Sequence, residues 1–248
     1  MKKSIGFFIM FLILGCARHD PRYDDIDISN NKRLYSLNHV ISVNGSNSFP
    51  KNPWKAWSDY RSDHLSLKRH LPNLMSEDVR IEVSTLEKEN LPKYFMLNKA
   101  RSEKMEEQYK NFQTSEWEKS NNAERGIAYV KRYVDYIAEL RCATRVESGS
   151  IALGVGRKSY QTNCNYFDRN GDPKLLHLGY DYMFTYSGTK FDGDKKSQAQ
   201  VVTPEAMQKQ FKEDMKAIFD SLQIHDMDRE RMAKEGLLHD RKYEIQEW

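Results

Sequence analysis

The clearest hydrophobic pattern is a strict alternation over residues 174–186. Every second position from Leu176 to Tyr186 is apolar or aromatic, and the positions between are mostly polar or small. A period of two residues is that of a strand with one buried face. Because Asn170-Gly171 is a strong signal for a two-residue turn, we expect a hairpin with the preceding segment, 160–168.

Weaker patterns predict further strands. Alternating positions or short apolar runs indicate four of them, at 33–44, 79–83, 142–146 and 151–155. Residues 54–75 are ambiguous between helix and strand. We therefore expect a meander of three or four antiparallel strands over residues 138–187.

Helical periods occur towards the C-terminus and before the meander. Thr203-Pro204 supplies an N-cap followed by proline at the first helical position, and an apolar stripe runs from Met207 to Leu222. Other helices are expected at 99–119, 123–137 and 227–235. Residues 123–141 also alternate with period two, broken by Arg132, so a strand remains the alternative there.

Together these elements predict an α+β fold, in which an antiparallel β-sheet has helices packed on one face. The sequence contains no internal repeat and no sharp change of composition. We therefore expect a single domain over residues 33–248, preceded by a polar segment at 16–32.

The first residues resemble an export signal. Lys2 and Lys3 precede an apolar run, Ile5 to Leu14, that is too short to cross a bilayer as a helix. Ile13-Leu14-Gly15 then precedes Cys16, and this resembles the lipobox of bacterial lipoproteins.

The lipoprotein resemblance implies a signal peptide at 1–15, cleaved after Gly15, and lipidation of Cys16. Ala17, rather than Asp, after the cysteine implies an anchor in the outer membrane, with the body in the periplasm. Residues 16–32 would then be a lipidated tether. In that oxidising compartment the two remaining cysteines, Cys142 and Cys164, are expected to form a disulfide.

Composition excludes several classes of protein. The chain has 248 residues, a net charge of +3 and 12% aromatic residues. The aromatic content argues against disorder, and the balanced charge gives no footprint for nucleic acid. The seven histidines show no metal-binding spacing, and no catalytic or nucleotide motif is present. We therefore predict no catalytic residues, no metal and no cofactor, and we do not expect an enzyme.

Asp168-x-Asn170-x-Asp172 resembles the start of a calcium loop, but Pro173 and Gly179 stand where that loop needs glycine and a carboxylate. We therefore expect a hairpin turn. His177 is expected to be exposed on the polar side of its strand.

The remaining candidate for function is a partner-binding surface. Trp54, Trp57 and Tyr60 lie close together after a loop, and aromatic side chains carry much of the binding energy of protein interfaces. We predict that these three residues contact a protein partner.

The general layout resembles the periplasmic immunity lipoproteins paired with type VI secretion effectors: lipobox, polar tether, one body and one cysteine pair. That resemblance implies a secreted, envelope-targeting effector as the partner. Two alternatives stay open. One is a structural or assembly lipoprotein of an envelope or secretion machine, and the other is a ligand binder or enzyme whose site the sequence does not reveal.

The lipidation prediction is tested by metabolic labelling. Radioactive palmitate should label the wild-type chain and should not label Cys16→Ser, because only the thioether of Cys16 would carry diacylglycerol. Equal labelling of both chains would contradict the prediction.

Overall fold

The computed structural model describes residues 24–26, 33–36, 38–44, 54–57, 63–71, 75–86, 111, 113–114, 116–120, 127–152, 155–185 and 204–240. Within these ranges strands account for 62% of the residues and helices for 16%. The strands form two antiparallel sheets. The predicted α+β class is therefore wrong, because the described chain is mostly β and its strands form two antiparallel sheets with only two helices beside them.

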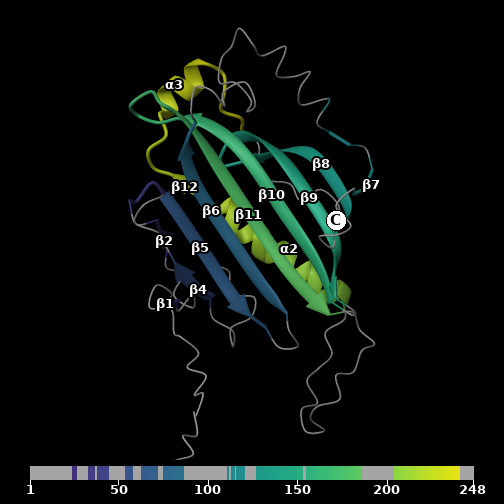
Figure 1. Ribbon diagram of the computed structural model, residues 1–248. Helices are drawn as coiled ribbons and strands as arrows, with labels where there is room; N and C mark the ends of the chain where they lie inside the picture. The colour runs from purple at the N-terminus through teal and green to yellow at the C-terminus, as the bar shows by residue number, and fades with distance from the viewer. Residues whose placement is uncertain are drawn as a thin grey trace, which may run out of the picture.

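The larger sheet has nine strands (Figure 1). In spatial order they are β1 (Asp24–Ile26), β4 (Trp54–Trp57), β5 (Asp63–His70), β6 (Ser76–Thr85), β11 (Pro173–Thr185), β10 (Val155–Phe167), β9 (Leu140–Ala152), β8 (Ile127–Ile137) and β7 (Glu118–Lys119). The smaller sheet is ordered β12 (Gln223–Ile224), β3 (Ile41–Asn44), β2 (Arg33–Tyr35).

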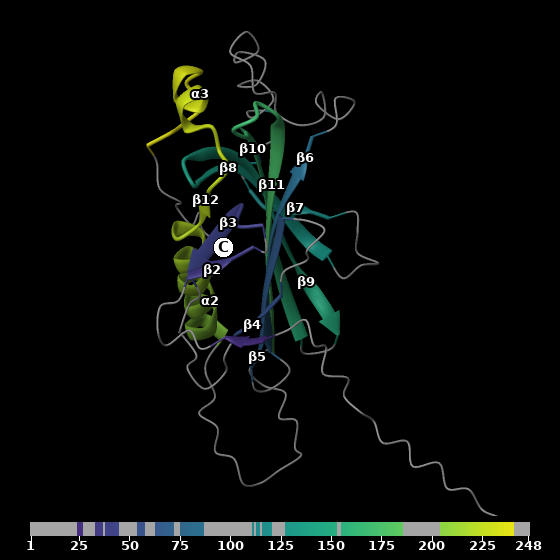
Figure 2. The same ribbon diagram turned by 90° about the vertical axis from the view of Figure 1, so that its left-hand side faces the viewer.

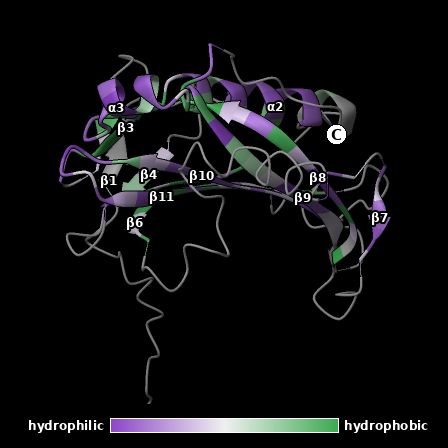
Figure 3. Ribbon diagram, turned by 90° about the horizontal axis from the view of Figure 1, so that it is seen from above, coloured by the Kyte–Doolittle hydropathy of each residue, from purple (hydrophilic) through white to green (hydrophobic). Residues whose placement is uncertain are grey.

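The helix α2 (Pro204–Asp220) and the smaller sheet lie on the same side of the larger sheet (Figure 2). Seen from above, the larger sheet is curved, and the short helix α3 (Arg229–Lys234) lies on that side too (Figure 3). What flanks the sheet is thus one long helix, one short helix and a second sheet. We call the opposite side of the larger sheet the outer face. Within the described ranges, neither helix is long and apolar enough to span a membrane.

Aromatic contacts join α2 to the larger sheet. The ring of Phe211 stacks on Tyr182 of β11, with centroids 4.4 Å apart, and Phe219 contacts the rings of Tyr160 and Tyr180. The predicted alternation is confirmed, because the α2 side of β11 is formed by the buried side chains of Leu176, Leu178, Tyr180, Tyr182 and Phe184.

The predicted turn between β10 and β11 is confirmed. Asp168 Oδ1 accepts hydrogen bonds from the backbone N–H groups of Asn170 and Asp172, each at 2.9 Å. Gly171 has φ of 84°, a conformation that glycine adopts without the steric cost of a Cβ. These acidic residues therefore build a turn, as expected.

The helix predicted over 123–137 is wrong, because residues 127–137 form β8 instead. β8 pairs with β9 through a two-residue turn, Ala138-Glu139, in which both residues have positive φ. The β-branched and aromatic residues of this segment favour a strand, and pairing with β9 decides between the two periods.

Two other predicted segments also differ from the structure. The single strand expected over 33–44 is divided into β2 and β3 by a turn, in which Ser36 Oγ accepts hydrogen bonds from the N–H groups of Val40 and Ile41. Within the helix expected over 99–119, Glu118 and Lys119 form β7, and residues 99–110 lie outside the described ranges.

The helix predicted after Thr203-Pro204, the helix predicted at 227–235 and the strand predicted at 79–83 are confirmed as α2, α3 and β6. Within the segment expected as a tether, Asp24–Ile26 form β1 and pair with β4. The signal peptide and Cys16 lie outside the described ranges.

The predicted disulfide is present between Cys142 of β9 and Cys164 of β10. The two cysteines are direct register partners, and their Cα atoms are 4.4 Å apart. That separation matches a non-hydrogen-bonded antiparallel pair, where side chains approach most closely. Both cysteines are buried on the α2 side, so the bridge is part of the core.

Removing this bridge should destabilise the fold. The disulfide joins two residues that are 22 positions apart in sequence. Without it the unfolded chain gains entropy, so the double variant Cys142→Ala/Cys164→Ala should lose about 3 kcal/mol of unfolding free energy. Urea unfolding of the mature Cys16→Ser chain, with and without the double substitution, measures this. Titration of the unfolded, unreduced Cys16→Ser chain should find no free thiol, and two titratable thiols would contradict the bridge.

Candidate functional site

Of the three residues predicted to contact a partner, only Trp54 has a described side chain. Trp54 is fully buried on the α2 side, and the guanidinium carbon of Arg69 lies 4.4 Å from its ring centroid. The burial of Trp54 gives no support to its predicted contact with a partner, which stays a prediction. Trp57 belongs to β4, but its side chain and all of Tyr60 lie outside the described residues.

Arg69 is instead the centre of a buried ion-pair network. Its Nε donates a hydrogen bond to Glu77 Oε2, and its Nη2 donates to Asp214 Oδ2 of α2. The Tyr180 hydroxyl is hydrogen-bonded to the other oxygen of Glu77. None of these four side chains is more than 1% exposed. The network therefore joins β5, β6, β11 and α2 in one place.

The charge of the network is balanced by a proton. Burial raises the pKa of Glu77 to about 8, the Arg69 guanidinium opposes this rise, and the nearby Asp214 carboxylate adds to it. Burial and the adjacent Glu77 also raise the pKa of Tyr180 well above its usual range. The raised pKa favours the neutral, protonated form of Glu77 near pH 7.

This network is structural. A general acid or base has to reach the reacting atoms, and all four side chains are closed off from solvent. Breaking one partner of such a buried pair leaves an uncompensated charge, which costs about 3–5 kcal/mol. The role of the network is therefore to hold α2 against the sheet.

The sequence holds a signal for this network that the motif search missed. Glu77 shares its parity with Val79 and Ile81, and Arg69 shares its parity with Leu67. Side chains of one parity lie on one face of a strand. A charged residue at a core position on each of two strands indicates a buried pair.

A serine and a histidine also meet in the smaller sheet. Ser42 Oγ lies 2.7 Å from His225 Nε2 and accepts a hydrogen bond from Arg33 Nη1 at 2.9 Å. Ser42 is completely buried, and the ring of Tyr35 stacks on His225. A nucleophile must be accessible to its substrate, so this pair serves to hold β3 against the residues that follow β12.

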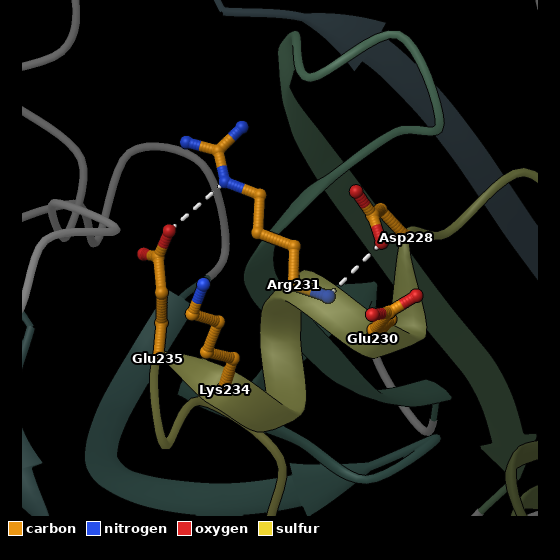
Figure 4. A pocket seen from close by; sticks show the side chains of 5 residues that line it. All are labelled: Asp228, Glu230, Arg231, Lys234 and Glu235. Carbon is orange, nitrogen blue, oxygen red and sulfur yellow. Dashed lines mark hydrogen bonds and ion pairs between the residues drawn. The ribbon is translucent and has the colours of Figure 1, made fainter.

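A shallow pocket of about 520 Å³ lies at α3 (Figure 4). It is lined by Asp228, Glu230, Arg231, Lys234 and Glu235. Arg231 donates a hydrogen bond to Glu235 and lies with its guanidinium carbon 3.4 Å from the ring centroid of Phe167. Small-molecule sites are mostly apolar with few polar groups, so this charged and internally paired pocket does not fit one. Among the residues that the structure describes, no group of three or more His, Cys, Asp or Glu is placed to hold a metal ion.

The outer face of the large sheet carries many charged side chains in the described structure. Four ion pairs cross it, namely Arg80–Asp78 at 3.3 Å, Arg157–Asp181 at 2.8 Å, Arg145–Glu147 at 2.6 Å and Arg132–Glu118 at 2.7 Å. Two of these pairs join residues of one strand, Arg80–Asp78 on β6 and Arg145–Glu147 on β9, and the other two join neighbouring strands.

His177 also lies on the outer face, but it is half-buried rather than exposed as predicted. Its Nδ1 is 2.8 Å from Asn163 Oδ1. Burial lowers the pKa of His177, which favours the neutral imidazole. The neutral ring can donate from Nδ1 to the amide oxygen of Asn163 and leave Nε2 as an acceptor.

Comparisons with known proteins add little to this geometry. No protein-family model and no curated protein match the chain. The solved structures include one similar chain, described as LpqN involved in cell envelope biogenesis of Mycobacterium tuberculosis. The two chains are 10% identical, the TM-score is 0.38, and the alignment covers 79% of this chain and 92% of that chain. A likeness at this TM-score carries no argument about fold or function.

The network predicts a pH dependence of stability. Because the folded pKa of Glu77 is raised from 4.5 to about 8, the folded state holds a proton that the unfolded state releases. The stabilisation is complete below about pH 4.5 and is lost as the pH rises towards about 8. Glu77→Gln cannot ionise, so the stability advantage of the wild type over this variant should shrink across that window.

Urea unfolding at pH 5, 6.5 and 8 measures this effect. Glu213→Gln, on the exposed side of α2 next to Asp214, is the matched control and should run parallel to the wild type. Parallel profiles for Glu77→Gln and the wild type would show that Glu77 does not hold the proton.

Proposed function

We propose that this chain is a periplasmic lipoprotein, anchored to the outer membrane through Cys16, that binds a protein partner. The partner proposed is a secreted effector that attacks the envelope, which the chain neutralises as an immunity protein. The proposal is supported by the lipobox-like residues 13–16 and by the disulfide in the core.

The observation that carries the proposal is the disulfide between β9 and β10. Thiols in the cytosol are kept reduced, whereas exported proteins form and keep such bridges. The bridge joins register partners at buried positions of neighbouring strands. An oxidising compartment is therefore the environment that suits this core, and the periplasm is the one to which a lipobox leads.

Binding of a protein is supported by the outer face of the sheet. Its side chains come from the neighbouring strands β5, β6, β11, β10, β9 and β8. Its arginines form ion pairs with carboxylates at neighbouring positions. Such a surface offers many oriented polar groups across a wide area. Arginine is enriched in protein interfaces, while small ligands are bound in concave and mostly apolar pockets.

Capture followed by an activity assay tests the proposal. The mature chain with Cys16→Ser, tagged at its C-terminus, is used as bait in envelope and culture fractions, and an unrelated tagged periplasmic protein is the control bait. We expect one stoichiometric secreted hydrolase, whose activity falls when the purified bait is added at an equimolar amount.

Two outcomes would contradict this proposal. Recovery of several subunits of a membrane machine, with no hydrolase inhibited, would favour the structural or assembly role. A failure to recover any protein, together with binding of a small molecule, would favour a ligand-binding role.

A further inference from the structure

The segment that would tether the body to the membrane is short. Asp24–Ile26 already form β1 and pair with β4, so only residues 17–23 separate Cys16 from the large sheet. From the Cα atom of Cys16 to that of Asp24 the chain spans at most about 29 Å when it is fully extended. The tether is thus much shorter than the segment 16–32 that the sequence led us to expect.

This tether joins the large sheet at one edge. β1 stands first in the strand order and β7 stands last, on the opposite side of the sheet (Figure 1). Neighbouring strands lie about 4.8 Å apart, so the nine strands extend about 38 Å from β1 to β7 along the sheet. Even a fully extended tether is therefore shorter than the sheet is wide. It cannot hold the β7 edge against a membrane while the β1 edge points away from it.

Strand pairing places the attachment point in the middle of this edge. Asp24 is the register partner of Ala56 on β4, and the same row continues through Leu67 of β5 to Val79 of β6. Leu67 and Val79 lie well inside their strands, β5 and β6. The tether therefore holds the sheet by its side rather than by the ends of its long strands.

Neither wide face of the sheet offers lipid a large apolar area. Within the described ranges, Tyr35 and Tyr129 are the exposed large hydrophobic residues, and they belong to different sheets. The outer face carries ion pairs, such as that of Arg157 with Asp181. Proteins bind lipid surfaces through buried apolar area and attraction to anionic headgroups. The orientation of the body at the membrane therefore depends on where the tether is attached.

We propose that the β1 edge of the large sheet faces the phospholipid surface of the membrane in which Cys16 is anchored, and that the short tether holds it there. This inference rests on the lipidation in the proposed function and specifies how the body is oriented. The wide faces and the β7 edge are then left accessible to a protein partner. The lipid surface also restricts access to an edge strand, and exposed edge strands pair readily with other chains.

Fluorescence quenching on vesicles tests this orientation. Lys55→Cys on β4 and Lys119→Cys on β7 are a matched pair, because both lysines are exposed and their strands lie near opposite edges. Arg80→Cys reports on the outer face and Glu213→Cys on the α2 side, and both residues are exposed. Thermal unfolding of each variant is recorded first.

Each introduced thiol can be labelled selectively with bimane, since Cys142 and Cys164 are bridged and Cys16 would be acylated. The lipidated full chains are reconstituted on phosphatidylcholine vesicles, with and without a lipid that carries a spin label on its headgroup as the quencher. The mature Cys16→Ser chain, labelled at the same positions, is the control without an anchor.

We expect bimane at position 55 to be quenched at least about twofold more than bimane at position 119, because β4 and β7 lie about 34 Å apart along the sheet. Positions 80 and 213 should give intermediate quenching. The control without an anchor should show no difference between positions 55 and 119.

A longer tether tests the cause of the orientation. Insertion of twelve Gly/Ser residues between positions 20 and 21 raises the maximum span of the tether to about 70 Å, which exceeds the width of the sheet. The ratio of quenching at positions 55 and 119 should then fall towards one. An unchanged ratio would overturn the short tether as the cause of the orientation.

The outcomes distinguish this inference from the proposed function. Anchored chains with equal quenching at positions 55 and 119, or with the strongest quenching at position 80 or 213, would overturn the inference while the lipidation stands. Vesicles that retain neither the wild-type chain nor the Cys16→Ser chain would overturn the lipidation, and this inference with it.

Discussion

Arg69 is fully buried, and a guanidinium can stay buried only if carboxylates and hydrogen bonds replace the water it has lost. The carboxylates come from Glu77 on the neighbouring strand and from Asp214 on a helix far away in sequence. Trp54 covers the guanidinium from the edge strand β4. The positions of α2 and of four strands thus depend on one charge, since each partner can satisfy it in only one arrangement.

The dependence of the fold on this one buried charge explains why the network is closed off from solvent on every side. Two ionised carboxylates around one guanidinium would leave a net negative charge in the core, and burial makes such a charge costly. A proton on Glu77 removes the excess, and the Tyr180 hydroxyl satisfies its second oxygen. The aromatic contacts of Phe211 and Phe219 then exclude water around it.

Local signals predicted the parts of the fold that depend on neighbours in sequence. The alternation of β11, the helix α2 with Pro204 as its first residue, the Asn170-Gly171 turn and the cysteine pair were all predicted from sequence and found. The hairpin of β8 and β9 was missed because its turn, Ala138-Glu139, has none of the usual turn residues. Contacts from distant residues support that turn, through Arg229 on the Glu139 carboxylate and the His239 N–H on the Glu139 carbonyl.

The candidate site was harder to predict because it also depends on contacts between residues that are distant in sequence. Trp54 has the sequence context of an exposed aromatic residue, and only the fold shows that Arg69 and the core cover it. The parities of Arg69 and Glu77 indicated charged residues on the buried side, but Asp214 completes the network from α2.

The two faces of the sheet are therefore under different constraints. The α2 side fixes the fold through the Arg69 network, the aromatic contacts and the disulfide, which contributes about 3 kcal/mol. The outer face accepts an interior glycine, at about 0.5–1 kcal/mol relative to alanine, and an opposed pair of arginines. A sheet can keep such unfavourable choices on one face when the other face supplies the stability.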